Sequence, residues 1–288
     1  VMLETPAVQL IQKDGQVVGA VAKNNGKNIN IKANKAVILT TGGYEFDPES
    51  LRTYAQGENY HALGNPGNTG DGLRMAQSMG ARLWHMTAYS CPLGTELPGC
   101  KAALQVAMMA PSFIWVDKNG KRFADEFSPD GHTRCYVVNR FDPISHPSIP
   151  CWLIFDDKAF KRGPVVGGSS GYSINREGYK WSRDNSQELA NGVITKAESL
   201  EELAKKIGVS AENLVAAVQK WNTDIKAGKD TQFNRPIQNP HKKVVHIEQK
   251  AGAAVSAPLD ETGPYYAIKL YPTLLNTQGG PKKNVNGQ

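Results

Sequence analysis

The chain has 288 residues, of which 40% are hydrophobic and 21% are charged, as is ordinary for a globular protein with a sizeable core. Its net charge of +6 comes from basic residues that are scattered in short pairs rather than gathered in a block, which argues against a nucleic-acid partner. No apolar run approaches the ~18 residues that a membrane-spanning helix requires, so the sequence predicts no transmembrane segment.

The first part of the chain has the pattern of a small antiparallel meander. Residues 6–10 and 16–21 alternate between apolar and polar side chains around Asp14-Gly15, a dipeptide that is typical of tight β-hairpins. A second turn at residues 24–27 leads into a third expected strand at residues 29–32.

The next stretch combines a short apolar run with glycine-rich segments. Residues 36–39 read Ala-Val-Ile-Leu and stop at Thr40-Thr41-Gly42-Gly43, which predicts a buried strand with glycine at its carboxyl end. Further on, residues 65–72 lead into an expected helix over residues 73–81. Glycine lets the backbone approach a ligand because no Cβ intervenes, and a helix start suits a phosphate or a polar cofactor edge. Spacing alone fits such a ligand-binding wall and an ordinary strand-to-helix turn equally well.

After residue 81 the pattern is that of a second, α+β region. Residues 112–116 and 151–156 are expected strands, and a turn after the first leads into the start of another strand near Phe123. Residues 263–268 are expected to return the chain, as a strand, to the region in which it began.

Two helices are expected between these strands. Ser199 caps the first, over residues 199–207, and Glu202 completes a capping box. Ser210 caps the second, which ends near Gly228. The apolar residues of the second helix share one face: Leu214, Val218 and Trp221.

The cysteines give no sign of a metal site. The four of them have neither C-x-x-C spacing nor a histidine at zinc-like intervals, which indicates free thiols. A haem attachment motif of the C-x-x-C-H type is also absent from the sequence.

Two long motifs resemble those of a flavoprotein superfamily. The stretches VILTTGGYEFDPESL and GNTGDGLRMAQSMGA are similar to the A-T-G-G and T-G-D-G-x-x-M-A-x-x-x-G-A motifs of the FAD-dependent fumarate reductase and succinate dehydrogenase superfamily, with Thr40 in place of the usual Ala. Soluble fumarate reductases, urocanate reductases and ketosteroid dehydrogenases are branches of this superfamily. The stretches NGKRFADE, AGKDTQFNR and GPYYAIKLYP, with TQGG after it, also match, so the resemblance extends over nearly the whole chain.

The resemblance implies an α/β fold with FAD as the cofactor. It implies a Rossmann-like FAD-binding domain, incomplete and discontinuous, at residues 1–90 and 263–288, with an inserted α+β capping domain at residues 91–262. The family's amino-terminal G-x-G-x-x-G unit and its carboxyl-terminal flavin-closing segment have no counterpart here, so we expect the sequence to be an internal fragment. The cofactor-binding residues that the resemblance implies are Ala7, Thr41, Gly42, Gly43, Thr69, Gly70, Asp71, Gly72, Gln278 and Gly279.

The residues that hold a dicarboxylate in the related fumarate reductases are replaced in this chain. Cys91 stands where those enzymes have a histidine at the domain crossing, and Leu275 and Asn276 replace a histidine pair. Because a dianion requires cationic anchors, the resemblance implies a substrate that is not a dicarboxylate.

The related reductases keep their arginine proton donor in the loop after the residue that matches Glu126. Asp130 occupies that position here, unless an insertion brings a later basic residue into it. The catalytic candidates by location are Arg134, His132 and Tyr136, and packing in the cap or at the surface is the alternative for each.

The functional hypothesis is an FAD-dependent oxidoreductase that acts on a carbon–carbon bond of a small organic substrate, by reduction of an activated double bond or by the reverse desaturation. A ketosteroid-type dehydrogenase is one alternative, although the Pro-Tyr of that branch is replaced by Pro129-Asp130. A truncated, non-catalytic relative is the other. Either a protein or a reduced cofactor would serve as the electron donor.

Overall fold

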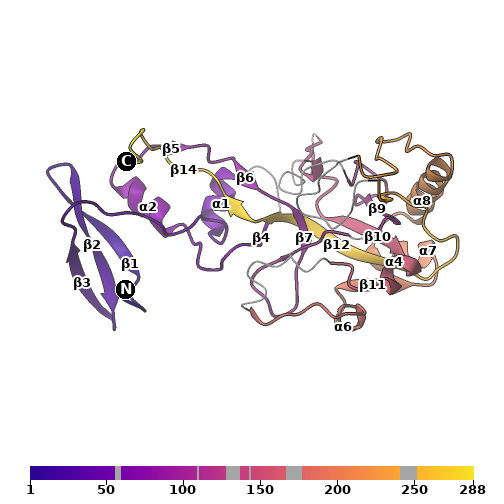
Figure 1. Cartoon of the computed structure of the whole chain (residues 1–288), viewed down its shortest axis with the longest axis horizontal. Coiled ribbons are helices and arrows are strands. Elements are labelled where there is room, and N and C mark those ends of the chain that lie inside the picture. The colour runs from indigo at the N-terminus through magenta and orange to yellow at the C-terminus, as the bar shows by residue number, and fades with distance from the viewer. Residues whose placement is uncertain (56–59, 109, 128–136, 143, 167–176, 241–251) are drawn as a thin grey trace. The chain divides into compact units, whose positions relative to one another are not determined.

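The computed structural model describes the chain except for residues 56–59, 109, 128–136, 143, 167–176 and 241–251. The chain forms two compact units (Figure 1). Unit 1 is Val1–Ala55, Asn65–Tyr89 and Asn276–Gln288, and unit 2 is Gln56–Gly64 and Ser90–Leu275. Each unit therefore joins segments that lie far apart in the sequence.

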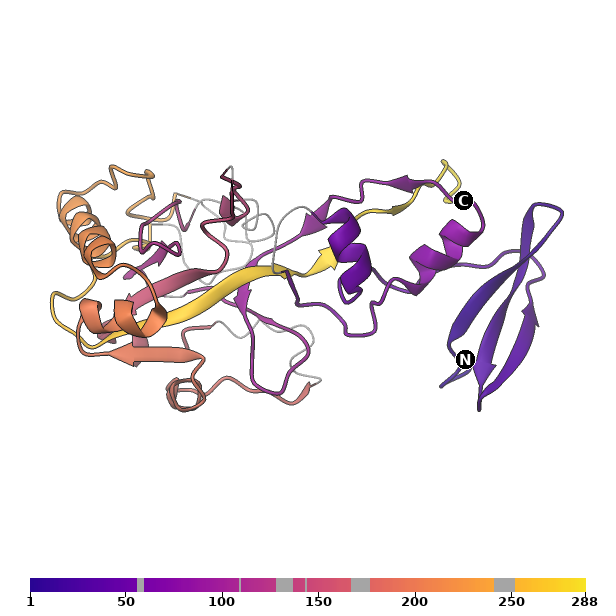
Figure 2. The same ribbon diagram turned by 180° about the vertical axis from the view of Figure 1, so that it is seen from behind.

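Unit 1 begins with the predicted meander. Strands β1 (Ala7–Lys13), β2 (Gln16–Asn24) and β3 (Lys27–Lys32) form an antiparallel sheet in chain order (Figure 2). The turn residues have positive φ, 52° and 76° in Asp14-Gly15 and 47° and 77° in Asn25-Gly26. Turns of this kind match the twist of the strands they join, so the hairpin prediction is confirmed.

Unit 1 also contains two short helices and several short strands. Helix α1 (Pro48–Tyr54) begins at Asp47, whose side chain accepts a hydrogen bond from the N–H of Glu49. Helix α2 (Asp71–Ser78) confirms the helix predicted after the glycine-rich segment, although it ends before residue 81. Its buried residues are Gly72, Leu73, Met75 and Ala76. The short strands are β5 (Leu83–Trp84), β6 (Tyr89–Ser90), β13 (Asn276–Thr277) and β14 (Gly280–Pro281).

The buried strand predicted at residues 36–39 is wrong. These residues have no strand assignment, and the side chains of Ile38 and Leu39 are 82% and 38% exposed. A strand is defined by the neighbour with which it pairs, and among the described residues none pairs with this segment. The apolar run therefore stays at the surface of unit 1.

The core of unit 2 is a sheet built around one long strand, β12 (Tyr265–Leu274). Its first half lies between β10 (Cys151–Asp156) and β11 (Ile194–Ala197), and both pair with it antiparallel. Its second half pairs with β7 (Leu93–Thr95) and β4 (His61–Ala62). The sheet is completed by β8 (Leu104–Gln105) and β9 (Phe113–Val116).

The strands expected in the second region are mostly present. Those predicted at residues 112–116 and 151–156 are β9 and β10, while the one expected near Phe123 is reduced to a single bridge between Val116 and Arg122. The strand expected at residue 263 is the start of β12, but it continues through the sheet of unit 2. The chain re-enters unit 1 only at Asn276.

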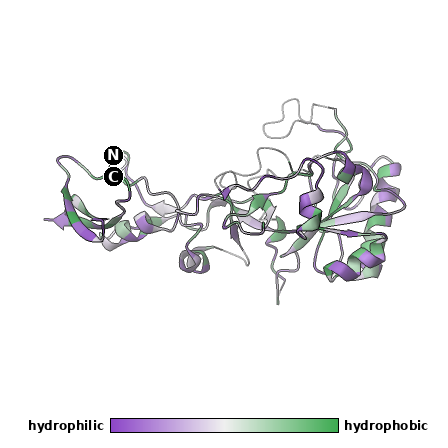
Figure 3. Ribbon diagram, turned by 90° about the horizontal axis from the view of Figure 1, so that it is seen from below, coloured by the Kyte–Doolittle hydropathy of each residue, from purple (hydrophilic) through white to green (hydrophobic). Residues whose placement is uncertain are grey.

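Two amphipathic helices cover this sheet (Figure 3). Helix α7 (Leu200–Ile207) is capped by Ser199, and α8 (Ala211–Lys226) by Ser210, each through its hydroxyl group, as predicted. The reciprocal bond of the capping box differs, because the Glu202 carboxylate accepts from the N–H of Glu198 rather than from that of Ser199. Leu214, Val218 and Trp221 are buried, as expected. In the described part of unit 2, two further short helices are α4 (Asp157–Lys161) and α6 (Ser186–Ala190). Over the ranges that the structure describes, no helix combines the length and apolar character needed to cross a bilayer.

Candidate cofactor site

The two glycine motifs are in contact within unit 1. The N–H of Gly70 donates to the carbonyl of Gly43 at 3.1 Å, and the N–H of Phe46 donates to the carbonyl of Asn68 at 3.0 Å. The Cα of Gly72 also faces Thr41, since a Cβ built on Gly72 would lie 1.9 Å from Thr41 Oγ1. The segment that follows the apolar run and the segment that opens α2 therefore form one layer of backbone.

Glycine is required at two positions of this layer for two separate reasons. Gly42 and Gly70 both have φ of 77°, a conformation that residues with a Cβ rarely adopt. An added Cβ at Gly42 would also lie 2.1 Å from Asn68 Oδ1, and one at Gly70 would lie 3.1 Å from Asp47 Oδ2. At both positions the backbone therefore packs so closely against a neighbouring side chain that a residue with a Cβ would not fit without moving that side chain.

The start of α2 carries an exposed group of charges. Arg74 binds Asp71 at 2.7 Å and Asp47 at 2.6 Å, and the hydroxyl of Thr69 donates to Asp71 at 3.2 Å. Burial raises the pKa of Asp47, but hydrogen bonds from Ser50 and the backbone and the charge of Arg74 outweigh it and leave that pKa below its usual value. Asp71 is therefore held by protein groups, with 57% of its side chain exposed.

The late loop joins the same layer. The hydroxyl oxygen of Thr277 accepts a hydrogen bond from the N–H of Tyr44 at 3.0 Å, and the N–H of Gln278 donates to the carbonyl of Ala88 at 2.9 Å. A Cβ on Gly279 would lie 2.4 Å from the carbonyl oxygen of His85. The three motifs that were singled out in the sequence therefore meet in unit 1.

Three residues at this meeting point, Tyr44, Glu45 and Asn68, were not among the candidates that the sequence suggested. Glu45 is 1% exposed, and its carboxylate accepts a hydrogen bond from Asn68. Tyr44 is 2% exposed and donates to the carbonyl of Met86 at 2.6 Å. Burial, and then the neighbouring Tyr54, Tyr89 and Glu45, raise the pKa of Tyr44 to about 12, so it remains a hydrogen-bond donor at neutral pH. In the sequence, only their position next to the glycine motifs could have pointed to these residues.

The remaining candidates are Ala7 and the catalytic candidates. Ala7 begins β1 opposite Ala22 and is exposed. Arg134, His132 and Tyr136, together with Asp130, lie outside the described residues. Cys91 is fully buried, and in the described part of the chain Cys91, Cys100 and Cys151 are not joined in disulfides.

Unit 2 contains a buried cluster of four charged residues, drawn from the stretches NGKRFADE and AGKDTQFNR. Arg122 binds Glu126 at 2.9 Å and Asp230 at 3.0 Å, and Arg235 binds Glu126 at 3.3 Å. The indole ring of Trp221 lies 4.5 Å from the guanidinium of Arg122 and 5.0 Å from that of Arg235. Two positive and two negative groups thus balance one another inside the core.

The electrostatics of this cluster reflect that balance. Burial alone would raise the pKa of Asp230, but the hydrogen bonds and charge of Arg122 outweigh it and lower the pKa to about 2. Burial lowers the pKa of Arg235, against the attraction of Glu126. Glu126 also accepts from the N–H of Trp115 at 3.0 Å, which ties the cluster to β9. It therefore fixes the residues just before the segment that contains the catalytic candidates.

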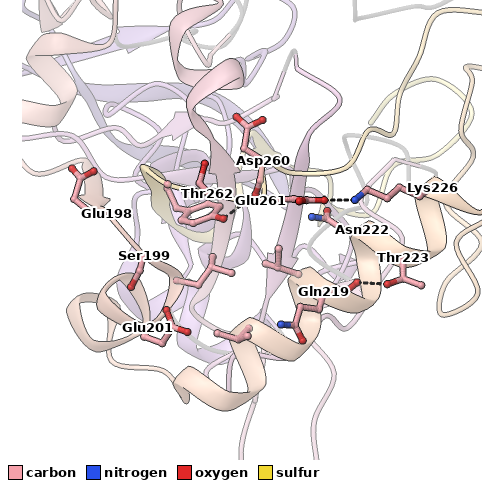
Figure 4. A pocket seen from close by; sticks show the side chains of 15 residues that line it. Glu198, Ser199, Glu201, Gln219, Asn222, Thr223, Lys226, Asp260, Glu261 and Thr262 are labelled. Atoms are coloured by element: carbon pink, nitrogen blue, oxygen red, sulfur yellow. Dashed lines mark hydrogen bonds and ion pairs between the residues drawn. The ribbon is translucent and has the colours of Figure 1, made fainter.

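A pocket of about 690 Å³ also lies in unit 2, beside α8 (Figure 4). Its carboxylates are largely neutralised by lysines, because Lys226 binds Glu261 and Lys158 binds Asp260. None of the candidate site residues that the structure describes lines this pocket. It is a hollow lined by both polar and apolar side chains.

Residues 1–288 match the family described as FAD binding domain. The chain belongs to this family. The FAD-binding chain is 28% identical to the 3-oxosteroid 1-dehydrogenase of Mycolicibacterium smegmatis, over 100% of the chain and 50% of that protein. It is 29% identical to the 4-oxocyclohexanecarboxylate 2-dehydrogenase of Sinomonas cyclohexanicum, over 93% of the chain and 44% of that protein. The chain thus spans about half the length of the curated relatives it matches.

Solved structures support the same assignment. The 3-ketosteroid delta1-dehydrogenase of Sterolibacterium denitrificans, in complex with 1,4-androstadiene-3,17-dione, matches 97% of the FAD-binding chain with a TM-score of 0.78 and 27% identity, and 49% of that structure is covered. A flavocytochrome c3 fumarate reductase matches with a TM-score of 0.64 at 24% identity, over 97% of this chain and 42% of its own, and shares the fold. The resemblance to this superfamily, the α/β FAD-binding fold and FAD as the cofactor are confirmed.

The residues of unit 1 fit such a cofactor. Gly42 and Gly43 pack their backbone against Asn68, Thr277 and Glu45, where an added Cβ would overlap these side chains, so the two glycines keep the layer in its conformation. Helix α2 begins at Gly70 without a side-chain cap, so its first N–H groups suit a polar cofactor edge. Which of these residues contact FAD, and the division into a cofactor domain and a cap, stay predictions.

Proposed function

We propose that the FAD-binding chain serves in an oxidoreductase that acts on a carbon–carbon bond next to the carbonyl of a ring ketone. The observation that carries this proposal is the set of relatives. The names of several of them specify 3-oxosteroid, 4-oxocyclohexanecarboxylate and 4-oxocyclohex-2-ene-1-carboxylate substrates, each a ring that carries an oxo group, while other relatives are fumarate reductases and an acrylate oxidoreductase. Desaturation of such a ring and reduction of the corresponding enone are the two directions of one reaction.

The chain's own residues favour this class over dicarboxylates. Cys91, Leu275 and Asn276 stand where the related fumarate reductases have histidines, and none of the three side chains is cationic. A dicarboxylate would therefore lack the charged partners that offset the loss of its hydration.

FAD, when bound, supplies hydride transfer, and the protein must orient the substrate and move a proton. A group within hydrogen-bond reach of the second carbon has to donate or accept that proton. We propose Arg134 for this role, with His132 and Tyr136 as alternatives, because all three follow the segment that the buried charge cluster fixes at Glu126. Either an electron-transfer protein or a reduced cofactor would exchange electrons with FAD.

The test uses the full-length protein. Purified protein is expected to show the flavin absorbance band, and anaerobic addition of a 3-oxosteroid or a 4-oxocyclohexane carboxylate is expected to bleach it. After reduction with dithionite, the matching enone is expected to restore the band. A protein that contains FAD but responds to none of these ketones would overturn the substrate class, and a protein without flavin would support a non-catalytic relative.

The catalytic assignment is tested separately. Arg134→Gln is expected to leave flavin content and dithionite reduction unchanged, while it slows enone-dependent reoxidation by at least ~100-fold, the lower range for loss of a general acid. Unchanged reoxidation in this variant, with a loss in His132→Gln or Tyr136→Phe, would transfer the role to that neighbour.

A further inference from the structure

We propose that Glu45 is a positioning residue for FAD, which clamps the three cofactor motifs together and places a fixed negative charge in the wall of the site. This inference rests on the proposed function, because it assumes that these motifs hold FAD.

Glu45 is buried without a cation. Its side chain is 1% exposed, and in the described part of the chain it forms no ion pair. Its carboxylate accepts from the amide of Asn68 and, at 3.5 Å, from the hydroxyl of Thr277, both of them neutral donors. A carboxylate buried with only neutral donors costs free energy, so its place in this layer calls for a compensating role.

Each donor to Glu45 comes from a different part of the chain. Asn68 precedes the glycine-rich start of α2, and Thr277 belongs to the late loop. Thr277 also accepts from the N–H of Tyr44, the neighbour of Glu45. One carboxylate therefore joins three segments that no strand pairing holds together.

The carboxylate also lies against the backbone of the second glycine. A Cβ built on Gly43 would lie 2.5 Å from Glu45 Oε2 and 2.2 Å from Thr277 Oγ1. The side chains of Glu45 and Thr277 therefore occupy one side of Gly43 and fix the position of its backbone. If Gly43 lines the FAD site, the carboxylate lies just behind the cofactor wall. If the part of FAD at Gly43 is the isoalloxazine ring, a fixed negative charge there disfavours adding electrons to the cofactor and lowers its reduction potential.

Three variants of the full-length protein separate the clamp from the charge. Glu45→Ala removes both, whereas Glu45→Gln removes only the charge, because a glutamine amide can still accept from Asn68 and donate to Thr277. Glu49→Ala is the matched control, since Glu49 is an exposed acid on nearby α1. The readouts are the dissociation constant for FAD, the midpoint potential of the bound flavin and the thermal midpoint of the apoprotein.

We expect Glu45→Ala to weaken FAD binding at least ~10-fold, the loss of one charge-assisted hydrogen bond. Glu45→Gln is expected to retain FAD and to raise its midpoint potential by at least ~30 mV, a tenfold change for a two-electron couple. Glu49→Ala should match the wild type in both.

If Glu45→Ala binds FAD as tightly as the wild type, the proposal that Glu45 holds the motifs together is wrong. If the midpoint potential is unchanged in Glu45→Gln, the proposal that its charge acts on the flavin is wrong. If Glu45→Ala fails to fold, the Gln variant still decides the role of the charge, and Asn68→Ala, which removes one of the two donors to Glu45, decides the clamp by the same measurement of FAD affinity. A wild-type protein without flavin would overturn the proposed function instead, and this inference with it.

Discussion

At Gly42, both the backbone conformation and the packing exclude a side chain on the Cα atom. Its φ of 77° disfavours any side chain, and its Cα hydrogen faces the Asn68 amide at a distance that leaves no room for a methyl group. Gly80 has a similar φ of 86° but no heavy atom within 4 Å of a built Cβ. The two glycines therefore differ only in what surrounds them.

This contrast gives the first prediction. Gly80→Ala is expected to lower the free energy of unfolding by ~1–2 kcal/mol, the cost of a left-handed alanine. Gly42→Ala is expected to cost more than Gly80→Ala and also to lose FAD, because Asn68 must move away from the motif. Urea unfolding and flavin content measure the two effects. Equal stability losses with full flavin content in both variants would show that Asn68 yields without consequence.

The buried Asp230 gives a prediction that depends on pH. Its pKa is lowered from 3.8 to about 2, so its contribution to stability is fully present above pH ~4 and is lost as the pH falls through ~2. The wild type is therefore expected to lose ~2 kcal/mol over this range beyond the loss in Asp230→Asn. Unfolding by urea at a series of pH values measures this difference, and parallel curves would contradict it.

At neutral pH the same substitution should be costly. Asp230→Asn leaves Arg122 short of a buried partner, for which ~3–5 kcal/mol is typical. The matched control is Glu261→Gln, which breaks the exposed ion pair with Lys226 and is expected to change stability very little.

At the scale of elements, local signals predicted structure well. Asp14-Gly15 fixes a hairpin because its turn needs only its own two residues, and Ser199 and Ser210 cap helices through bonds that span three residues. The prediction failed at residues 36–39, because a strand needs a partner that the segment itself does not encode. The meeting of Glu45 with Asn68 and Thr277 was equally out of reach, since those contacts join distant parts of the chain.

The two helix caps, Ser199 and Ser210, give a prediction about the stability of unit 2. Ser199→Ala and Ser210→Ala are each expected to destabilise unit 2 by ~1 kcal/mol, since each removes a side-chain acceptor from a helix start. Thr223→Ala is the control, because its hydroxyl bonds only the carbonyl of Gln219 within α8. Chemical denaturation of the three variants decides the matter, and a Thr223→Ala loss as large as the others would argue against a specific capping effect.

At the scale of the whole molecule, the question is which substrates the protein accepts. If Cys91, Leu275 and Asn276 line the substrate site, they offer no charge to a dicarboxylate, and an unpaired carboxylate in a closed site costs several kcal/mol. Each ~4 kcal/mol lowers affinity about a thousandfold. The full-length enzyme is therefore expected to reduce fumarate negligibly with a reduced viologen as donor, in an assay where a ring enone is turned over. Robust fumarate reduction would contradict the proposed substrate class.

The larger segment of unit 2 enters at Ser90 and leaves at Leu275, and these two residues are hydrogen-bonded to each other, N–H to carbonyl, at 2.9 Å. An insertion whose ends adjoin can be exchanged without displacing the chain on either side of it. If unit 1 is the cofactor domain, exchange of this segment together with Gln56–Gly64, whose strand β4 pairs with β12, would change the substrate part and keep the flavin-binding framework. A protein engineer could use Ser90 and Leu275 as two of the splice points for chimaeras between this chain and its ketosteroid relatives.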